Sequence, residues 1–178
     1  MKDFIFDLQR FVNISNRNNE TVLSGGDDDD NITNWGADVR IDCGGGEDIV
    51  TNYKDGSGVT INGGADNDVI NNMSAPNVII YGGAGDDNIQ NTGSYGIVNG
   101  DAGNDYIENK GNNFTFKYKN GDGNDSIKGF SENSTLSIDG SEYSTQASGD
   151  DVIVTLAALN LWMELVWTAR QLRCQRSR

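Results

Sequence analysis

Aspartate recurs at one fixed place in a glycine-rich motif along this chain. The clearest copy spans residues 82–90, Gly-Gly-Ala-Gly-Asp-Asp-Asn-Ile-Gln, and fits Gly-Gly-x-Gly-x-Asp-x-U-x, where U is a large aliphatic residue. Glycine reaches positive φ and lets main-chain oxygens approach an ion closely. The carboxylate of Asp87 adds a hard oxygen ligand of the kind that calcium prefers. The motif therefore predicts a calcium-binding loop, followed by a short strand with Ile89 buried.

The same frame occurs six times. Counted from position one of each motif, the copies start at residues 25, 43, 63, 82, 100 and 120, in steps of 18, 20, 19, 18 and 20. Position eight is always Ile or Val, and position six is always aspartate: Asp30, Asp48, Asp68, Asp87, Asp105 and Asp125. Self-similarity at a fixed period is the signature of a repeat architecture in which each unit stacks on its neighbours.

A second apolar pattern precedes each loop. Aliphatic or aromatic residues lie two places before the loop, at Leu23, Ile41, Ile61, Ile80, Val98 and Tyr118. Others lie two residues further back, at Val39, Val59, Val78 and Phe116. Alternation with a period of two is typical of strands. Each unit is therefore expected to form a loop, a strand, a bend and a second strand, which together make one coil of a two-sheet solenoid.

Asparagine marks the opposite end of each unit. Position ten is Asn34, Asn52, Asn72, Asn91 and Asn109, with Gly129 in the sixth unit. Stacked coil on coil, these side chains are expected to form an amide ladder; the alternative is a set of unrelated turn asparagines. Between position ten and the next strand the length varies as 4, 6, 5, 4 and 6 residues, whereas positions one to ten show no insertion. One edge of the solenoid is thus expected to be rigid and the other free to vary.

The charge of the chain favours cations as partners. The 178 residues have a net charge of −14, and residues 21–155 hold 23 Asp and Glu against 6 Lys and Arg, or about −17. Such a charge argues against nucleic acid and anionic membranes as partners. The chain has no histidine, which excludes His-based zinc proteases and the Ser-His-Asp triad. Its carboxylate pairs are interpreted as ion ligands rather than a glycosidase site, so no enzymatic activity is expected.

The array resembles the repeats-in-toxin family, the haemolysin-type calcium-binding repeats of bacterial secreted proteins. The resemblance covers residues 21–130, and residues 131–156 look like the short β region, or β cap, that often follows such repeats. It implies about four or five calcium ions held between six loops, export by a type I secretion machinery, and an extracellular, secreted or cell-surface location. Asp28 and Asp66 depart from the family pattern at position four, as Asp101 does at position two, and the motif is clear on one edge only.

In that family, glycine-rich carbonyls and aspartates of adjacent loops hold calcium jointly. Carried over to this chain, the implied metal ligands are the six position-six aspartates and the loop residues Gly26, Asp28, Gly44, Gly46, Gly64, Asp66, Gly83, Gly85, Gly103, Gly121 and Gly123. The alternatives are a fragment or accessory module of a larger secreted enzyme, and an adhesin that binds cell-surface material.

The two ends of the chain differ from the array. Residues 1–20 are expected to be a leader, either a cap over the first coil or a partly ordered terminus, with Phe4, Leu8 and Phe11 or Val12 on one helical face. Asp3 and Asp7 interrupt its apolar run, so no cleavable signal peptide is expected. Residues 157–178 predict an apolar helical tail, which is a secretion or membrane-surface element, a docked capping helix or an aberrant foreign end. Its apolar side chains are expected to dock on the last coil or to self-associate with a second chain. No segment is long enough to span a membrane. The expected fold is all-β: a parallel β-roll, or two-sheet right-handed solenoid, with a short β extension and this tail.

Overall fold

The computed structural model describes residues 4–5, 11–119, 121–130, 133–139, 143–148, 151–156 and 163–165. These residues form strands, turns and loops, and they contain no helix. Two parallel sheets wind into a β-solenoid of about seven turns. The predicted all-β, parallel two-sheet solenoid is therefore confirmed.

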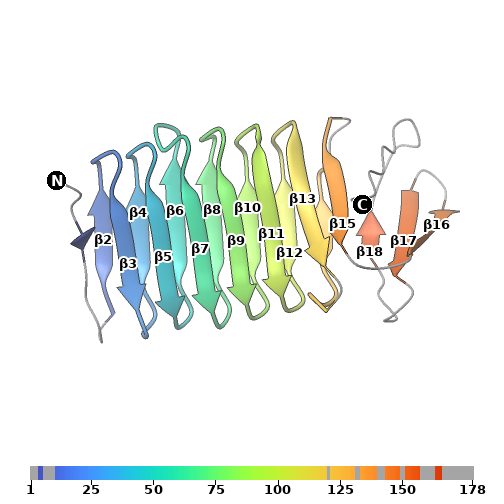
Figure 1. Ribbon diagram of the computed structural model, residues 1–178, viewed down its shortest axis with the longest axis horizontal. Helices are drawn as coiled ribbons and strands as arrows, with labels where there is room; N and C mark the ends of the chain where they lie inside the picture. The colour runs from blue at the N-terminus through green and yellow to red at the C-terminus, as the bar shows by residue number, and fades with distance from the viewer. Residues whose placement is uncertain are drawn as a thin grey trace.

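The strands alternate between the two sheets along the chain. The eight-stranded sheet contains β1 (Phe4–Ile5), β3 (Val22–Gly26), β5 (Arg40–Gly45), β7 (Thr60–Ala65), β9 (Ile79–Ala84), β11 (Gly96–Ala102), β13 (Phe114–Lys119) and β15 (Thr135–Asp139). The seven-stranded sheet contains β2 (Asn13–Asn16), β4 (Asn31–Asn34), β6 (Ile49–Tyr53), β8 (Val69–Met73), β10 (Asn88–Asn91), β12 (Tyr106–Asn109) and β14 (Ser126–Lys128). Odd-numbered strands point down and even-numbered strands point up in Figure 1, so each coil has a lower and an upper edge.

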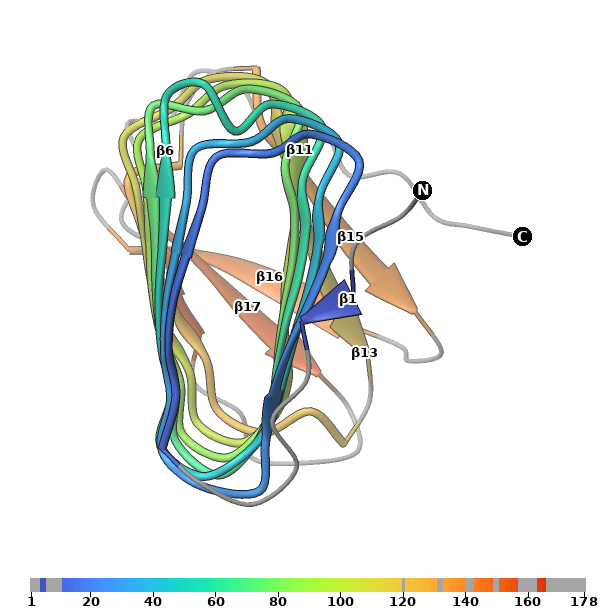
Figure 2. The same cartoon turned by 90° about the vertical axis from the view of Figure 1, so that its left-hand side faces the viewer.

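The core is a narrow apolar column between the two sheets. Seen along the solenoid, the coils superpose as one elongated loop (Figure 2). Alternate side chains of each strand point inward, and in-register pairing stacks like on like: Ile41 lies beside Ile61, and Ile61 beside Ile80, all with 0% exposure. Full burial of one such aliphatic side chain stabilises the fold by about 1.5–3 kcal/mol. The core is therefore continuous along the array. It is thin, because each sheet contributes only one layer of side chains to it.

The sixth coil departs from the predicted register. Gly96 pairs with Phe114 and Val98 pairs with Phe116, whereas the sequence pattern aligned Val98 with Tyr118. A Cβ at Gly96 would lie 2.8 Å from the ring of Phe114, so the ring occupies space that the glycine leaves free. The two extra residues lie after Phe116, on the lower edge, because Gly123 stacks on Gly103 again. The expectation that the lower edge has no insertion is wrong for this coil.

The solenoid begins earlier than the sequence pattern predicted. Strand β2 pairs with β4 in register, with Ile14 beside Ile32 and Asn16 beside Asn34. Residues 13–16 thus repeat the second strand of a unit, and Val12 takes the place of the position-six aspartate. Phe4 lies in β1, which pairs with β3, so the helical face expected for the leader is wrong at this residue; Leu8 lies outside the described residues.

The predicted β extension follows the array. Strand β15 adds to the eight-stranded sheet, and β16 (Tyr143–Ser148), β17 (Asp151–Leu156) and β18 (Met163–Leu165) form an antiparallel sheet in that order. Strand β18 contacts β14, at the end of the seven-stranded sheet. The helix expected in the tail is wrong at Met163–Leu165, because these residues pair with β17; the rest of the tail lies outside the described residues.

Candidate metal centre

The loops that lead from each odd-numbered solenoid strand to the next even-numbered strand lie at the lower edge (Figure 1), and a position-six aspartate ends each of the loops before β4 to β14. Each aspartate directly precedes an even-numbered strand, so the in-register pairing of β4 to β14 stacks the six aspartates in one column. All six are buried, with at most 4% of their surface exposed. Charged side chains are seldom buried without a partner. The partners of these carboxylates therefore decide what the edge can do.

One oxygen of each carboxylate is satisfied by the backbone. Oδ1 accepts a hydrogen bond from the main-chain N–H of the equivalent residue one coil earlier. The donors are Val12 to Asp30 at 2.7 Å, Asp30 to Asp48 at 2.6 Å, Asp48 to Asp68 at 2.8 Å, Asp68 to Asp87 at 2.8 Å, Asp87 to Asp105 at 2.9 Å, and Asp105 to Asp125 at 3.1 Å. The sheet repeat thus aligns the aspartates and ties each one to the next coil.

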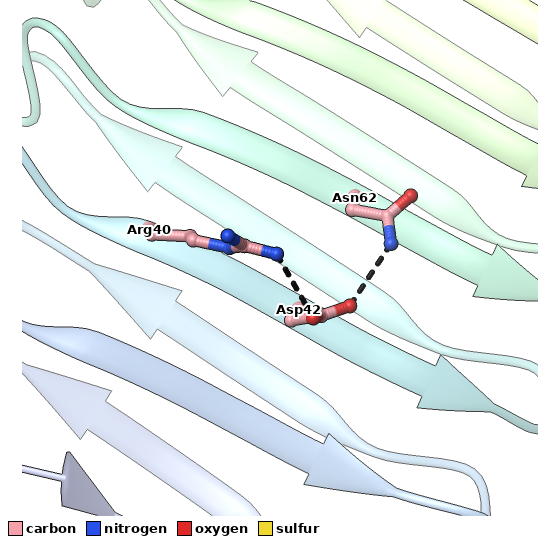
Figure 3. A network of polar contacts seen from close by, with 3 residues as sticks. All are labelled: Arg40, Asp42 and Asn62. Atoms are coloured by element: carbon pink, nitrogen blue, oxygen red, sulfur yellow. Dashed lines mark hydrogen bonds and ion pairs between the residues drawn. The ribbon is translucent and has the colours of Figure 1, made fainter.

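The other oxygen is different. Oδ2 of Asp48, Asp68, Asp87 and Asp105 is buried and accepts no hydrogen bond from the described part of the chain. Asp42, on the outer face of β5, shows the contrasting case (Figure 3): one of its oxygens lies 3.4 Å from Nη2 of Arg40, and the other accepts a 2.9 Å hydrogen bond from Asn62. Leaving a charged oxygen buried and unpaired is costly. Among the described residues, the Oδ2 atoms of these four aspartates therefore lack the positive charge and the donor that Asp42 has.

The pKa values of the column aspartates reflect their burial without a positive partner. Burial raises the pKa of Asp48, Asp68 and Asp87 to about 7, although the backbone N–H bond to each lowers it, and neighbouring aspartates add to the rise. Burial likewise raises the pKa of Asp105 to about 6 and that of Asp125 to about 7. Both effects disfavour the charged carboxylate. A cation beside Oδ2 would reverse this balance.

Main-chain oxygens converge on the same places. We call the following arrangement a cradle. Beside the position-one glycine of a loop, Oδ2 of the position-six aspartate of that loop lies close to the position-one carbonyl oxygen of the next loop. A Cβ added at Gly63 would collide with both Oδ2 of Asp68 and the carbonyl oxygen of Gly82. At Gly82 it would collide with Oδ2 of Asp87 and approach the carbonyl oxygen of Gly100 to 2.5 Å. These cradles present a carboxylate and a carbonyl oxygen, the ligand types that suit calcium.

The predicted loop residues hold the tight turn that brings these oxygens together. At position two, φ is positive at Gly44, Gly64, Gly83, Asp101 and Gly121, and at position four it is positive at Gly46, Asp66, Gly85, Gly103 and Gly123. Asp66 and Asp101, with φ of 74° and 68°, adopt the left-handed conformation that glycine adopts in the other loops. Gly26 and Asp28 lie beneath Gly44 and Gly46 and stack on them through their main chains. Asp66 and Asp101 thus preserve the loop shape, whereas Gly26 and Asp28 of the first loop do not adopt positive φ.

Sequence analysis missed a further set of contacts at position five. The position-five N–H of one loop donates to the position-five side chain of the preceding loop: Glu47 to Asp29 at 2.8 Å, Asp86 to Asn67 at 2.7 Å, Asn104 to Asp86 at 2.7 Å and Asn124 to Asn104 at 3.2 Å. The signal was present, because position five is Asp or Asn in every loop but the second. These exposed bonds hold successive loops in register.

The opposite edge carries the predicted asparagine ladder. Nδ2 of each asparagine donates to Oδ1 of the next: Asn16 to Asn34 at 2.8 Å, Asn34 to Asn52 at 2.8 Å, Asn52 to Asn72 at 3.1 Å, Asn72 to Asn91 at 2.7 Å and Asn91 to Asn109 at 2.6 Å. Asn109 ends the ladder on the carbonyl oxygen of Gly129 at 3.2 Å. Each Nδ2 also donates to a carbonyl of its own bend, so both donor positions are used. The ladder is confirmed, with Asn16 as an additional member.

Side chains alone do not make a metal site here. In the described part of the chain, no three His, Cys, Asp or Glu side chains gather closely enough to hold a metal ion. A cation on the lower edge would therefore need main-chain carbonyl ligands, which the cradles supply. The described residues also include no helix that could cross a membrane. No protein-family model matches the sequence, and no match is found among curated proteins.

Proposed function

We propose that this chain is a calcium-binding module that folds fully only when calcium neutralises its lower edge. The observation that carries the proposal is that Oδ2 of Asp48, Asp68, Asp87 and Asp105 is buried without a hydrogen-bond partner among the described residues, and that at Asp68 and Asp87 it lies near a carbonyl oxygen of the next loop. Bound calcium would supply positive charge between successive loops. The ligands from this chain would be the position-six carboxylates and the carbonyl oxygens of the glycine-rich loops.

The chain's own residues explain why folding and binding would be coupled. The single apolar column supplies a thin core, while residues 21–155 bring together about −17 of charge. In the unfolded chain the aspartates are hydrated and far apart, so the cradles do not exist there. A ligand that binds only the folded state stabilises it in proportion to RT ln(1 + [L]/Kd). Such sites work best where calcium is plentiful, which supports an extracellular location.

The repeats-in-toxin resemblance of residues 21–130 supports the same proposal. It adds export by a type I route and folding after export to the calcium-rich exterior. The affinity expected for an extracellular module is about 10⁻⁴ to 10⁻³ M.

Calcium titration followed by far-UV circular dichroism and calorimetry tests the proposal. We expect a strand signal that grows with calcium and heat exchange that saturates in the same concentration range. Magnesium is the control, because it demands a smaller octahedral site. Full strand content in excess chelator together with no calcium heat would overturn the proposal.

A further inference from the structure

The second loop differs from its neighbours at position one. Position one is glycine in four loops, at Gly25, Gly63, Gly82 and Gly100, asparagine in the sixth, at Asn120, and cysteine in the second, at Cys43. Pairing of β3, β5 and β7 places Cys43 in register between Gly25 and Gly63. Cys43 therefore stands at the place that defines a cradle in the adjacent coils.

The glycine at this place is a steric requirement of the open cradle. In all four glycine loops, an added Cβ would collide with Oδ2 of the position-six aspartate of the same loop. Cys43 has this Cβ and a sulfur atom beyond it, and its side chain is fully buried in the core with 0% exposure. The place that Oδ2 of Asp68 and Oδ2 of Asp87 approach beside Gly63 and Gly82 is therefore taken by a Cβ in the second loop.

The sulfur does not replace the lost oxygen geometry. Sulfur is a soft ligand, whereas calcium prefers hard oxygen atoms. Oδ2 of Asp48 nevertheless accepts no hydrogen bond, so Cys43 fills the space without satisfying the carboxylate.

We propose that Cys43 closes the cradle between the second and third loops to calcium, so that the number of bound ions is set by the residue at position one rather than by the number of aspartates. The proposal rests on the calcium-binding function proposed above. It makes position one the determinant of which loop pairs bind.

Opening and closing single cradles tests the proposal in the full-length chain. Bound calcium ions are counted by native mass spectrometry and by calorimetry at saturating calcium. Cys43→Gly is expected to gain one ion per chain relative to the unchanged protein. Cys43→Ala removes the sulfur but keeps the Cβ and is expected to gain none. Gly82→Ala places a Cβ in an open cradle and is expected to lose one ion.

The outcomes separate the two proposals. If Cys43→Gly and the unchanged protein bind the same number of ions, or if Cys43→Ala gains one as well, Cys43 does not act through its Cβ and the inference is overturned. If Cys43→Gly fails to fold, as judged by circular dichroism in calcium, an undiminished count in Gly82→Ala overturns it. If the unchanged protein binds no calcium, the proposed function itself fails.

Discussion

The two edges of the solenoid both stack one polar side chain per coil, but they use different residues. Both place one short polar residue per coil in a buried column, and both columns follow the in-register pairing of the even-numbered strands. Asparagine offers donors and an acceptor, so each ladder member satisfies the next. Ionised aspartate offers acceptors only. Its Oδ1 finds a backbone donor, while Oδ2 of Asp68 and Asp87 finds none.

This difference teaches where the stability of each edge comes from. The asparagine edge is complete without any added component, because every Nδ2 has two acceptors within the protein. The aspartate edge is incomplete in charge, since its carboxylates are stacked together and no cationic side chain among the described residues pairs with Oδ2 of Asp48, Asp68, Asp87 or Asp105. The asparagine edge therefore fixes the coil geometry, whereas the aspartate edge makes that geometry depend on the ions in the surrounding solution. Five predictions test this contrast.

The largest effect is expected from calcium itself. In excess chelator near pH 8, we expect the chain to lose most of its strand signal, because the carboxylates then repel one another inside the fold. Millimolar calcium should restore the signal, and the same concentration of magnesium should restore much less. Far-UV circular dichroism measures both. A chelated protein that keeps full strand content would mean that the asparagine ladder and the core suffice.

Protons should partly replace the cation. The ordinary aspartate pKa of about 3.9 is raised to about 7 at Asp48, Asp68 and Asp87 and to about 6 at Asp105. Between the unfolded pKa of about 3.9 and the folded pKa values of about 6 to 7, the folded state therefore binds more protons than the unfolded state. The free energy of unfolding without calcium falls as the pH rises through the folded pKa values. We expect the urea midpoint in chelator to be higher at pH 5 than at pH 8. A midpoint that rises with pH would contradict this.

Removing one carboxylate from the middle of the column should weaken calcium binding. Asp87 lies between Asp68 and Asp105, and we expect Asp87→Ala to raise the calcium midpoint by about tenfold, equivalent to about 1.4 kcal/mol. Asp55→Ala is the matched control, because Asp55 is exposed in a bend of the opposite edge. Calcium titrations of both variants decide the matter. Equal shifts would show that overall charge, rather than the column, governs binding.

Breaking the ladder should destabilise the protein whether or not calcium is present. Asn91→Ala removes one of the two hydrogen bonds of Asn72 Nδ2 and one of the two of Asn109 Oδ1, and it takes away the acceptor of the Gly93 N–H. We expect a loss of about 1–3 kcal/mol, the cost of leaving buried polar groups unpaired. Gln90→Ala, on the exposed face of the same strand, should change stability little. Urea unfolding in calcium measures both, and a calcium-dependent loss at Asn91 would show that the edges are coupled.

Much of this arrangement follows from the sequence, because the repeat fixes it. Position six, position eight and position ten predicted the aspartate column, the buried aliphatic column and the asparagine ladder by spacing alone. The first coil was missed because Val12 replaces the aspartate that marked the frame, although Ile14 and Asn16 keep the spacing. The register of the sixth coil was missed because both Phe114 and Phe116 satisfy a period of two. Only three-dimensional packing over Gly96 decides between them.

The unpartnered oxygens also lay beyond the sequence. A motif gives the residue types of a loop, but it does not say which carboxylate oxygen will accept the hydrogen bond from the backbone N–H of the neighbouring coil. That choice depends on strand spacing and on the direction of the side chain. The role of position one likewise depends on three-dimensional distances, because a Cβ there would collide with Oδ2 of the same loop.

The smallest effect is expected where the aspartate edge departs from its own pattern. Asp66 holds φ at 74° at a position where other loops have glycine. The left-handed conformation costs a residue with a side chain about 1–2 kcal/mol, while glycine costs about 0.5–1 kcal/mol more entropy on folding. Asp66→Gly should therefore stabilise the protein by less than about 1 kcal/mol, with urea unfolding in calcium as the measurement. Because the Asp66 carboxylate is not in the column, the Asp66→Gly variant should bind the same number of calcium ions as the unchanged protein. Loss of an ion would make this carboxylate a ligand and extend the set of carboxylate ligands beyond position six.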